Sequence, residues 1–324
     1  MEKRKVKLDK KDWRLLYELE KNARLPLQGL AKKLGTSKQL IRYMLNKFEE
    51  QKIVQAYTAI IDSSRLGYST YRLYIKFSQV NTPEKREEFY HFLASIPETT
   101  IVNSIDMRWD AGLIIAVQSV DAFYAVFDRI MQKRAFIDEY NAAVYSPVHH
   151  FTRSLLSPEP TNEVPAIRVM GGHEKVECEE SDVKILQELA KNVRQPIVRI
   201  AQKVKLGAQH VSRRISAMEK NGVIQGYRPL LNWKLLGYSY YKIDLKLKSF
   251  SHNKELFSYC HHHPQIIQVN QTIGGGDFEF EVFAKSDAEF HSILKEILEK
   301  FSDTVINYDY FIVGKPYKET FMAF

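Results

Sequence analysis

Two short stretches of the chain carry polar side chains that can hydrogen-bond to the edges of DNA bases. In each stretch apolar residues recur at helical spacing, and the polar residues fall on the opposite face. These polar residues are Gln39, Arg42, Tyr43 and Asn46 in the first stretch, and Gln209, Ser212, Arg213 and Ser216 in the second. Gln can pair bidentately with adenine, and Arg with guanine, in the major groove. We therefore expect Gln39, Arg42, Gln209 and Arg213 to contact bases.

Other polar residues flank these faces and can bind phosphate. Lys38, Lys47 and His210 lie where phosphate contacts are expected, and Ser37 stands directly before the first of these two stretches. Arg214 lies nearer the apolar side of its helix. Two interpretations of Arg214 stay open: a contact with DNA, or an ion pair with a carboxylate of the same chain.

Each of these faces belongs to the third of three predicted helices. In the N-terminal part of the chain the apolar residues that indicate the three helices are Leu15, Leu16, Leu19, Leu27, Leu30, Ala31, Leu34, Ile41, Leu45 and Phe48. Pro26 stands at the start of the second helix, Gly35 follows its end, and Thr36 and Ser37 can cap the third. A tight turn between the second and third helices of a small bundle is typical of a helix-turn-helix.

The chain contains this pattern twice. Segments that start at Asp12 and Asp182 align without a gap at an offset of 170 residues, and the offset holds to Lys76 and Lys246. Leu66-Gly67-Tyr68-Ser69, for example, returns as Leu236-Gly237-Tyr238-Ser239. The chain is therefore interpreted as two copies of one unit.

After the helices, the hydrophobic period changes to that of strands and helices in the order βαββαβ. In the first copy the predicted elements are 71–77, 83–94, 100–105, 113–117, 121–131 and 141–145, and in the second they are 241–247, 254–261, 266–272, 278–284, 288–301 and 305–312. This order predicts a ferredoxin-like module. The fold class is therefore α+β, with two winged-type helix-turn-helix modules, each followed by a ferredoxin-like module.

Composition places the domain boundaries. Prolines, the Gly171-Gly172 pair and several glutamates mark a linker at 154–180. The predicted domains are a helix-turn-helix domain at 1–57, a ferredoxin-like sensor and dimerisation domain at 58–153, a second helix-turn-helix domain at 181–227 and a second ferredoxin-like domain at 228–324.

Positive charge is concentrated in the helical modules. The net charge is +8, but residues 1–57 hold 15 Lys and Arg against 7 Asp and Glu, and residues 182–227 hold 9 against 3. This distribution is expected if the helical modules face phosphates and the α+β modules do not. The sequence therefore predicts double-stranded DNA as a partner.

These residues resemble the Lrp/AsnC family of transcription regulators, also called feast/famine regulators. The resemblance rests on 30–37, Val211-Ser212-Arg213-Arg214-Ile215 and 221–227, and it covers both copies outside the linker. It implies a RAM-type ferredoxin-like module that self-associates and often binds an amino acid. Members of the family are usually single copies that dimerise, so the doubled chain is expected to form a pseudo-dimer within itself.

The resemblance also implies an effector loop in the second copy. Gly274, Gly276 and Asp277 match the family's Gly-x-x-Asp-aromatic pattern, in which glycine lets a ligand approach and Asp can bind an ammonium group. A simple hairpin turn explains the same residues, so both interpretations stay open. The first copy has Met107-Arg108-Trp109 in place of the glycines, so no effector is expected there.

An enzyme is the main alternative, because the sirohaem decarboxylases resemble this family and share its two-module fold. That resemblance implies a strand motif with His and Arg, whereas neither 103–110 nor 270–277 contains His. We expect no catalytic residues and no cofactor. We also expect no metal, since the histidines at 149–150 and 261–263 are adjacent and point in different directions.

Cys178 and Cys260 lie far apart, and no apolar run is long enough to cross a bilayer. A cytoplasmic protein with reduced thiols, and no membrane partner, is expected.

Overall fold

The structure is a computed structural model that describes residues 7–79, 82–160 and 163–320. The chain forms two compact units, each built from both copies of the repeat. The first unit comprises Met1–Ile61, Phe151–Arg168 and Glu177–Tyr238, and the second comprises Asp62–His150, Val169–Val176 and Ser239–Phe324. The helix-turn-helix modules therefore share one unit, and the α+β modules share the other.

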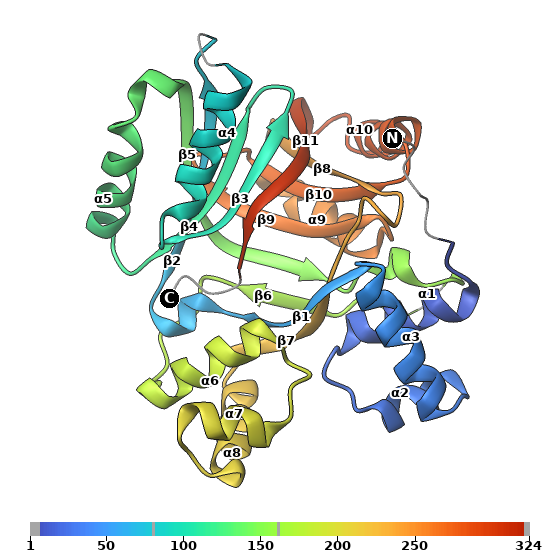
Figure 1. The fold of residues 1–324 in the computed structure, drawn as a ribbon. Coiled ribbons are helices and arrows are strands. Elements are labelled where there is room, and N and C mark those ends of the chain that lie inside the picture. The colour runs from blue at the N-terminus through green and yellow to red at the C-terminus, as the bar shows by residue number, and fades with distance from the viewer. Residues whose placement is uncertain (1–6, 80–81, 161–162, 321–324) are drawn as a thin grey trace. The chain divides into compact units, whose positions relative to one another are not determined.

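The first unit contains two three-helix modules (Figure 1). Their helices are α1 (Lys10–Lys21), α2 (Leu27–Leu34), α3 (Lys38–Glu50), α6 (Glu180–Lys191), α7 (Ile197–Val204) and α8 (Ala208–Lys220). Leu15, Leu30 and Ile41 are fully buried, as their helical spacing predicts. Gly35 ends α2 in the left-handed conformation, and Lys205 takes the same conformation after α7.

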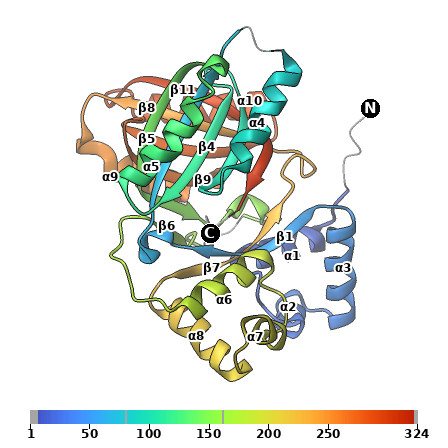
Figure 2. The same ribbon diagram turned by 60° about the vertical axis from the view of Figure 1, so that its left-hand side comes forward.

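The two helical modules are joined by a two-stranded antiparallel sheet. Strand β1 (Val54–Ile61) follows α3, and β7 (Ile224–Leu231) follows α8; the two strands pair around Thr58 and Arg228. The packing is crossed, because α1 contacts the strand of the second copy and α6 contacts the strand of the first. Figure 2 shows β1 and β7 running together beside both sets of helices.

Equivalent contacts from each copy tie the two modules of this unit together. The N–H of Ala23 donates to the carbonyl oxygen of Tyr227, and the N–H of Val193 donates to that of Tyr57. The guanidinium of Arg194 lies 5.3 Å from the ring centre of Tyr57, and that of Arg24 lies 5.4 Å from Tyr227. These paired contacts hold α3 and α8 in one arrangement within the unit.

The second unit contains two four-stranded sheets. The first copy supplies β2 (Ser69–Phe77), α4 (Pro83–Ser95), β3 (Thr99–Asp106), β4 (Ala111–Val117), α5 (Val120–Met131) and β5 (Ile137–Phe151). The second supplies β8 (Ser239–Leu247), α9 (Asn253–His262), β9 (Ile266–Ile273), β10 (Phe278–Ala284), α10 (Asp287–Lys300) and β11 (Val305–Glu319). Both sheets have the strand order of a ferredoxin-like module, β5-β2-β4-β3 and β11-β8-β10-β9. The predicted fold class is confirmed.

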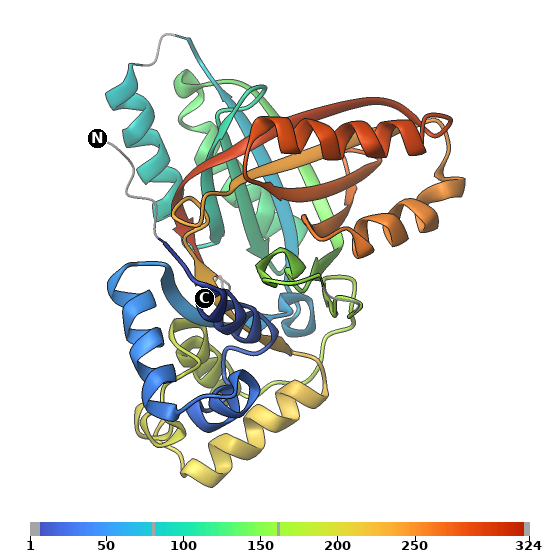
Figure 3. The ribbon, with the colours of Figure 1, turned by 90° about the vertical axis from the view of Figure 1, so that its right-hand side faces the viewer.

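The two sheets close into one barrel. Strand β11 of the second copy pairs with β3 of the first, and β5 of the first copy pairs with β9 of the second, both antiparallel. Each outer strand of one sheet thus finds its partner in the other copy, which removes the exposed edges. Figure 3 shows α9 and α10 along the outside of the second copy's strands.

Each sheet presents one face to its own helices and one to the barrel interior. In the first copy Leu73, Ile75 and Phe77 pack with Phe89 and Leu93 of α4 in one apolar core. Alternate residues of the same strands, such as Arg72 and Tyr74, are also buried although they lie on the other face.

Several elements differ from the sequence-based expectation. Strands β5 and β11 extend well beyond the predicted 141–145 and 305–312, and β1 and β7 were not predicted. The expected linker contains structure as well, including the turn at Ser154–Leu156 and β6 (Ile167–Met170). Arg168 in this segment is buried and donates to the backbone carbonyls of Glu20 and Lys21. Short 3-10 turns also occur at Ser63–Leu66, Arg134–Phe136 and Phe250–His252.

Among the described residues, the helices are too short or too polar to cross a bilayer.

Two glycines with positive φ allow a matched test of close packing in the loops. Gly274 has φ +90°, and a Cβ there would lie 2.7 Å from the carbonyl oxygen of Ala142, whereas Gly237 has φ +84° and open space around it. We expect Gly237→Ala to lower the free energy of unfolding by about 1 kcal/mol through backbone strain, and Gly274→Ala to lower it by roughly 1–3 kcal/mol more. Urea unfolding of both variants measures the difference. Equal losses would show that the loop of Gly274 shifts at no cost.

Candidate nucleic-acid interface

The outer face of α3 is exposed along its length. Ser37 caps the helix by accepting a hydrogen bond from the N–H of Leu40 at 3.2 Å, as its position predicts. The predicted contact residues that are exposed on or just before this helix are Ser37, Lys38, Gln39, Arg42, Tyr43 and Asn46. Tyr43 is 67% exposed. This surface can donate and accept hydrogen bonds without any rearrangement of the core.

The outer face of α8 is the corresponding surface of the second copy. Gln209, His210 and Arg213 are exposed, and Ser212 is half-buried. The helix starts after Gly207, which has no side chain with which to cap it. Arg42 corresponds to Ser212 in the aligned copies, and Tyr43 corresponds to Arg213. The guanidinium therefore stands one position further along α8, about 100° around the helix axis.

Two of the predicted contact residues bind carboxylates of their own module. The ammonium of Lys47 lies 2.7 Å from the carboxylate of buried Asp12, so Lys47, predicted as a phosphate contact, already has a partner in α1. Arg214 donates from Nε to Asp182 at 2.6 Å and lies 2.9 Å from Glu179, which is the second of its two interpretations. Asp12 and Asp182 are equivalent in the two copies, and each receives a cation from the third helix.

The predicted effector loop is a tight turn in which Asp277 has a backbone partner. Its carboxylate accepts a hydrogen bond from the N–H of Leu247 at 2.9 Å. Asp110, the equivalent residue of the first copy, accepts from the N–H of Phe77 at 2.8 Å. Each aspartate therefore has the same structural role, as the acceptor of a backbone hydrogen bond, which agrees with the hairpin interpretation of the loop. Ligand binding by Gly274, Gly276 and Asp277 stays a prediction.

The barrel interior holds a buried cluster of charged side chains that the sequence did not reveal. Arg72 Nη1 lies 2.7 and 2.6 Å from the two carboxylate oxygens of Glu279, and both side chains are almost fully buried. Lys242 also binds Glu279 and lies 2.7 Å from Asp244. Glu281 accepts from the side chains of Tyr240, Gln268 and Asn270. The signal in the sequence is the alternation of Phe and Glu at 278–281, which also suits a solvent-facing strand.

Electrostatics in the cluster follow from burial and from the two cations. Burial alone would raise the pKa of Glu279, but Lys242 and Arg72 outweigh it and lower the pKa to about 2. Burial raises the pKa of Glu281 above its usual value, and it does the same for Asp244 although Lys242 opposes it. The ion pairs of Glu279 are therefore intact at neutral pH.

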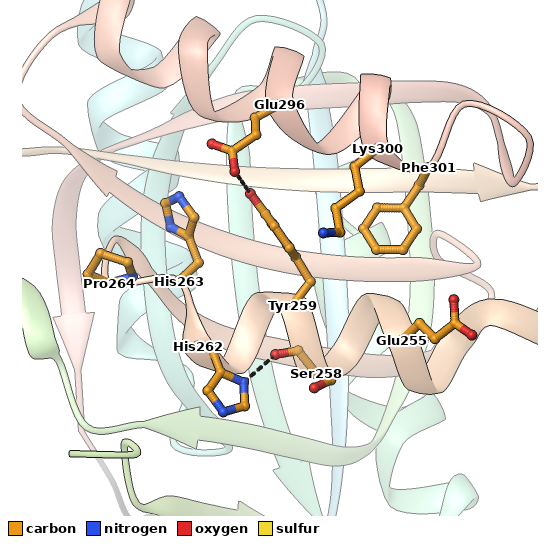
Figure 4. Close-up of a pocket in the computed structure, with 9 residues that line it drawn as sticks. All are labelled: Glu255, Ser258, Tyr259, His262, His263, Pro264, Glu296, Lys300 and Phe301. Atoms are coloured by element: carbon orange, nitrogen blue, oxygen red, sulfur yellow. Dashed lines mark hydrogen bonds between the residues drawn. The ribbon is translucent and has the colours of Figure 1, made fainter. Parts of the chain in front are cut away.

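A pocket of about 540 Å³ lies on the outside of the second copy, between α9 and α10 (Figure 4). The hydroxyl of Tyr259 donates to Glu296 at 2.5 Å, and the ammonium of Lys300 lies 5.2 Å from the Tyr259 ring centre. Ring nitrogen Nδ1 of His263 is buried there without a hydrogen-bond partner. In the first copy, Phe92 and Lys133 make the similar cation–ring contact without the hydroxyl. The pocket thus presents groups of both charges to a small polar molecule.

Within the part of the chain that the structure describes, no group of three or more His, Cys, Asp or Glu side chains is arranged to hold a metal ion.

Comparison with known proteins gives consistent relatives for the repeated unit. A family model for a winged helix-turn-helix DNA-binding domain matches residues 8–55 and 179–225. A leucine-responsive regulatory protein of Rhizobium meliloti is 32% identical over 127 residues, which are 38% of this chain and 81% of that protein. The HTH-type transcriptional regulator LrpA of Pyrococcus horikoshii is 34% identical over 110 residues, which are 34% of this chain and 74% of LrpA.

A solved structure also aligns with nearly the full length of the chain. The crystal structure of the siroheme decarboxylase NirDL aligns with 96% of this chain and 93% of its own, with a TM-score of 0.64 and 15% sequence identity. At this identity the likeness concerns the fold alone.

The backbone contacts of the two loop aspartates lead to a stability prediction. Asp277→Ala and Asp110→Ala each leave a backbone N–H without its acceptor, so each is expected to lower the free energy of unfolding by about 1–3 kcal/mol. Asp→Asn at the same positions keeps an acceptor oxygen and should cost less. Urea unfolding of the four variants measures this. If Asp277→Ala does not change the free energy of unfolding, the N–H of Leu247 does not depend on this carboxylate. Asp277 would then be free to bind a ligand without loss of stability.

Proposed function

We propose that this chain, which belongs to the Lrp/AsnC family of transcription regulators, is a sequence-specific DNA-binding regulator with two unlike recognition helices. The observation that carries the proposal is the pair of exposed polar faces on α3 and α8, each in a basic helix-turn-helix module. Arg and Gln on such faces suit the major groove. The relatives support this function because their names describe transcription regulators.

The chain supplies both recognition helices of a regulator that is usually a dimer. We infer a tandem duplication, which the two matches to the helix-turn-helix model support. The backbone hydrogen bonds of Ala23 with Tyr227 and of Val193 with Tyr57 link the two modules directly. A fixed arrangement of α3 and α8 requires a fixed spacing of the half-sites, about one helical turn of DNA or a multiple of it.

A response to an amino acid or a related small molecule is the finer part of the proposal. Two places in the second copy can serve it: the loop of Gly274, Gly276 and Asp277, and the pocket between α9 and α10. Further self-association through the ferredoxin-like modules is proposed by analogy with the family. Effector binding and self-association would each make DNA binding depend on the state of the second unit.

An enzyme resembling the siroheme decarboxylases is the second candidate, and the likeness of fold to NirDL favours it. Against it, the strand segments 103–110 and 270–277 contain no His. A DNA-reading face is also not required for decarboxylation, whereas both helical modules here are basic. Titration with a tetrapyrrole followed by absorbance, with mass spectrometry for loss of a carboxylate, distinguishes the enzyme from the regulator.

The shifted guanidinium predicts an asymmetric operator. Arg42→Ala should relax base preference in one half-site only, and Arg213→Ala in the other, each at a cost of about 1–3 kcal/mol in binding. Lys38→Ala should weaken binding to all sequences alike and reduce its salt dependence. Selection of bound sites from random DNA, with the parent and each variant, measures these effects.

Neighbouring Arg214 provides the matched control for Arg213. Because Arg214 binds Asp182, Arg214→Ala should lower the free energy of unfolding without changing base preference in the protein that remains folded. A symmetric palindrome, or relaxation of both half-sites by one substitution, would contradict the proposal of unlike recognition helices. Absence of DNA binding at low salt would contradict the regulator itself.

Calorimetry against a panel of amino acids tests the effector. Asp277→Asn keeps the structural hydrogen bond but removes the charge, so loss of binding in this variant, and not in Asp110→Asn, would place the ligand at the loop. Loss on Glu296→Gln instead would place it in the pocket between α9 and α10. If the parent protein binds no amino acid, the effector proposal is wrong and the loop is only a turn.

A further inference from the structure

Two buried ion pairs join the first copy of the repeat to the second, one in each unit. In the second unit, Arg72 of the first copy binds Glu279 of the second. In the first unit, Glu20 of the first copy lies 3.3 Å from Arg228 of the second. All four residues are at most 3% exposed. A buried charge that loses its partner is strongly destabilising, so these contacts depend on which modules meet.

The equivalent positions in the other copy do not repeat these ion pairs, because Arg72 corresponds to a second cation, Lys242, and Glu279 corresponds to a neutral residue. Alignment of the paired strands puts Gly112 of the first copy where the second has Glu279, because Gly112 pairs with Tyr74 as Glu279 pairs with Asp244. In the first unit, Glu20 corresponds to Ala190 and Arg228 corresponds to Thr58. These two neutral residues make a different contact, since the hydroxyl of Thr58 donates to the carbonyl of Ala190 at 3.0 Å.

Pairing of two first copies would therefore bury a cation without its partner. Arg72 would face Gly112 of the other module, which offers no carboxylate. The same loss would occur twice in a symmetric pair.

Pairing of two second copies would bring like charges together. Thr58 and Arg228 lie directly opposite each other in the β1–β7 sheet, so in such a pair Arg228 would face its own equivalent. The barrel would meanwhile have Lys242 in the place of Arg72, and it would hold six carboxyl groups, from Asp244, Glu279 and Glu281, against only two ammonium groups. A pair of two first copies and a pair of two second copies are therefore both disfavoured, because each buries charges that are not balanced by opposite charges.

We propose that these two ion pairs are a pairing code, through which the inner faces of each copy accept only the unlike copy as partner. The partner can come from the same chain or, by exchange, from a second one. Association of chains then always places a first copy against a second copy. The inference concerns the assembly of the protein and holds whether or not the chain binds DNA.

The test uses the full chain in two charge-reversed forms, Arg72→Glu and Glu279→Arg. Within its own chain each form brings two like charges together, so each alone should unfold at a temperature lower by roughly 10 °C or more. Between the two forms the charges are complementary: exchange pairs the two introduced charges and reunites native Arg72 with native Glu279. Co-expression under two affinity tags should yield a two-chain complex with the unfolding midpoint of the parent.

An exposed ion pair between the copies supplies the matched control. Arg108 lies 2.7 Å from Asp309, but these side chains are 52% and 58% exposed. Arg108→Glu and Asp309→Arg should therefore change neither the unfolding midpoint nor the association of tagged chains beyond that of the parent. If the mixed forms of Arg72 and Glu279 recover no stability, or if each form alone is as stable as the parent, the pairing code is wrong.

Neutral variants keep the proposal testable if the reversed forms do not fold. Glu279→Gln leaves Arg72 without its counter-charge and should lower the midpoint, whereas Arg72→Met together with Glu279→Gln should recover most of the loss. Losses that simply add in the double variant would show that the two residues act independently. That outcome would overturn the code in the second unit.

Discussion

Closure of the barrel is the constraint on which the second unit depends. A four-stranded ferredoxin-like sheet has two edges, and here β3 and β5 of one copy are completed by β11 and β9 of the other. Closure satisfies the backbone of these strands, but it also converts the exposed face of each sheet into an interior. Polar side chains on that face must then find partners inside, which is why the charged cluster around Glu279 exists.

Strand pairing between the copies also buries a charged side chain in the first unit. Strands β1 and β7 hydrogen-bond to each other, and their pairing buries Arg228 opposite Thr58. Three guanidinium groups, from Arg153, Arg168 and Arg228, lie within 4 Å of the carboxylate of Glu20. Arg153 and Arg168 both come from residues 151–168, which belong to the first unit, so this stretch contributes to the helical unit as well as connecting its parts.

The sequence predicted the elements whose signals are local. Helical spacing of residues such as Leu15 and Ile41, and the cap at Ser37, are decided within a few residues, and α1 to α3 lie where expected. Strand alternation also located most of both sheets. It could not decide whether the polar face of a strand meets water or another sheet, so Arg72 and Glu279 were missed. The ion pair of Lys47 with Asp12 was missed for a similar reason, because the two residues lie on different helices.

The contact between Arg168 and Gly226 limits how these two positions can change. A Cβ at position 226 would lie 2.8 Å from Nε of Arg168, and the glycine has φ +151°. Any side chain at 226 would therefore meet both a strained backbone and the guanidinium of Arg168, so a chain that retains Arg168 must retain the glycine. Homologues with the same two-copy architecture that keep Arg168 should consequently keep the glycine, although the two positions lie 58 residues apart in the sequence.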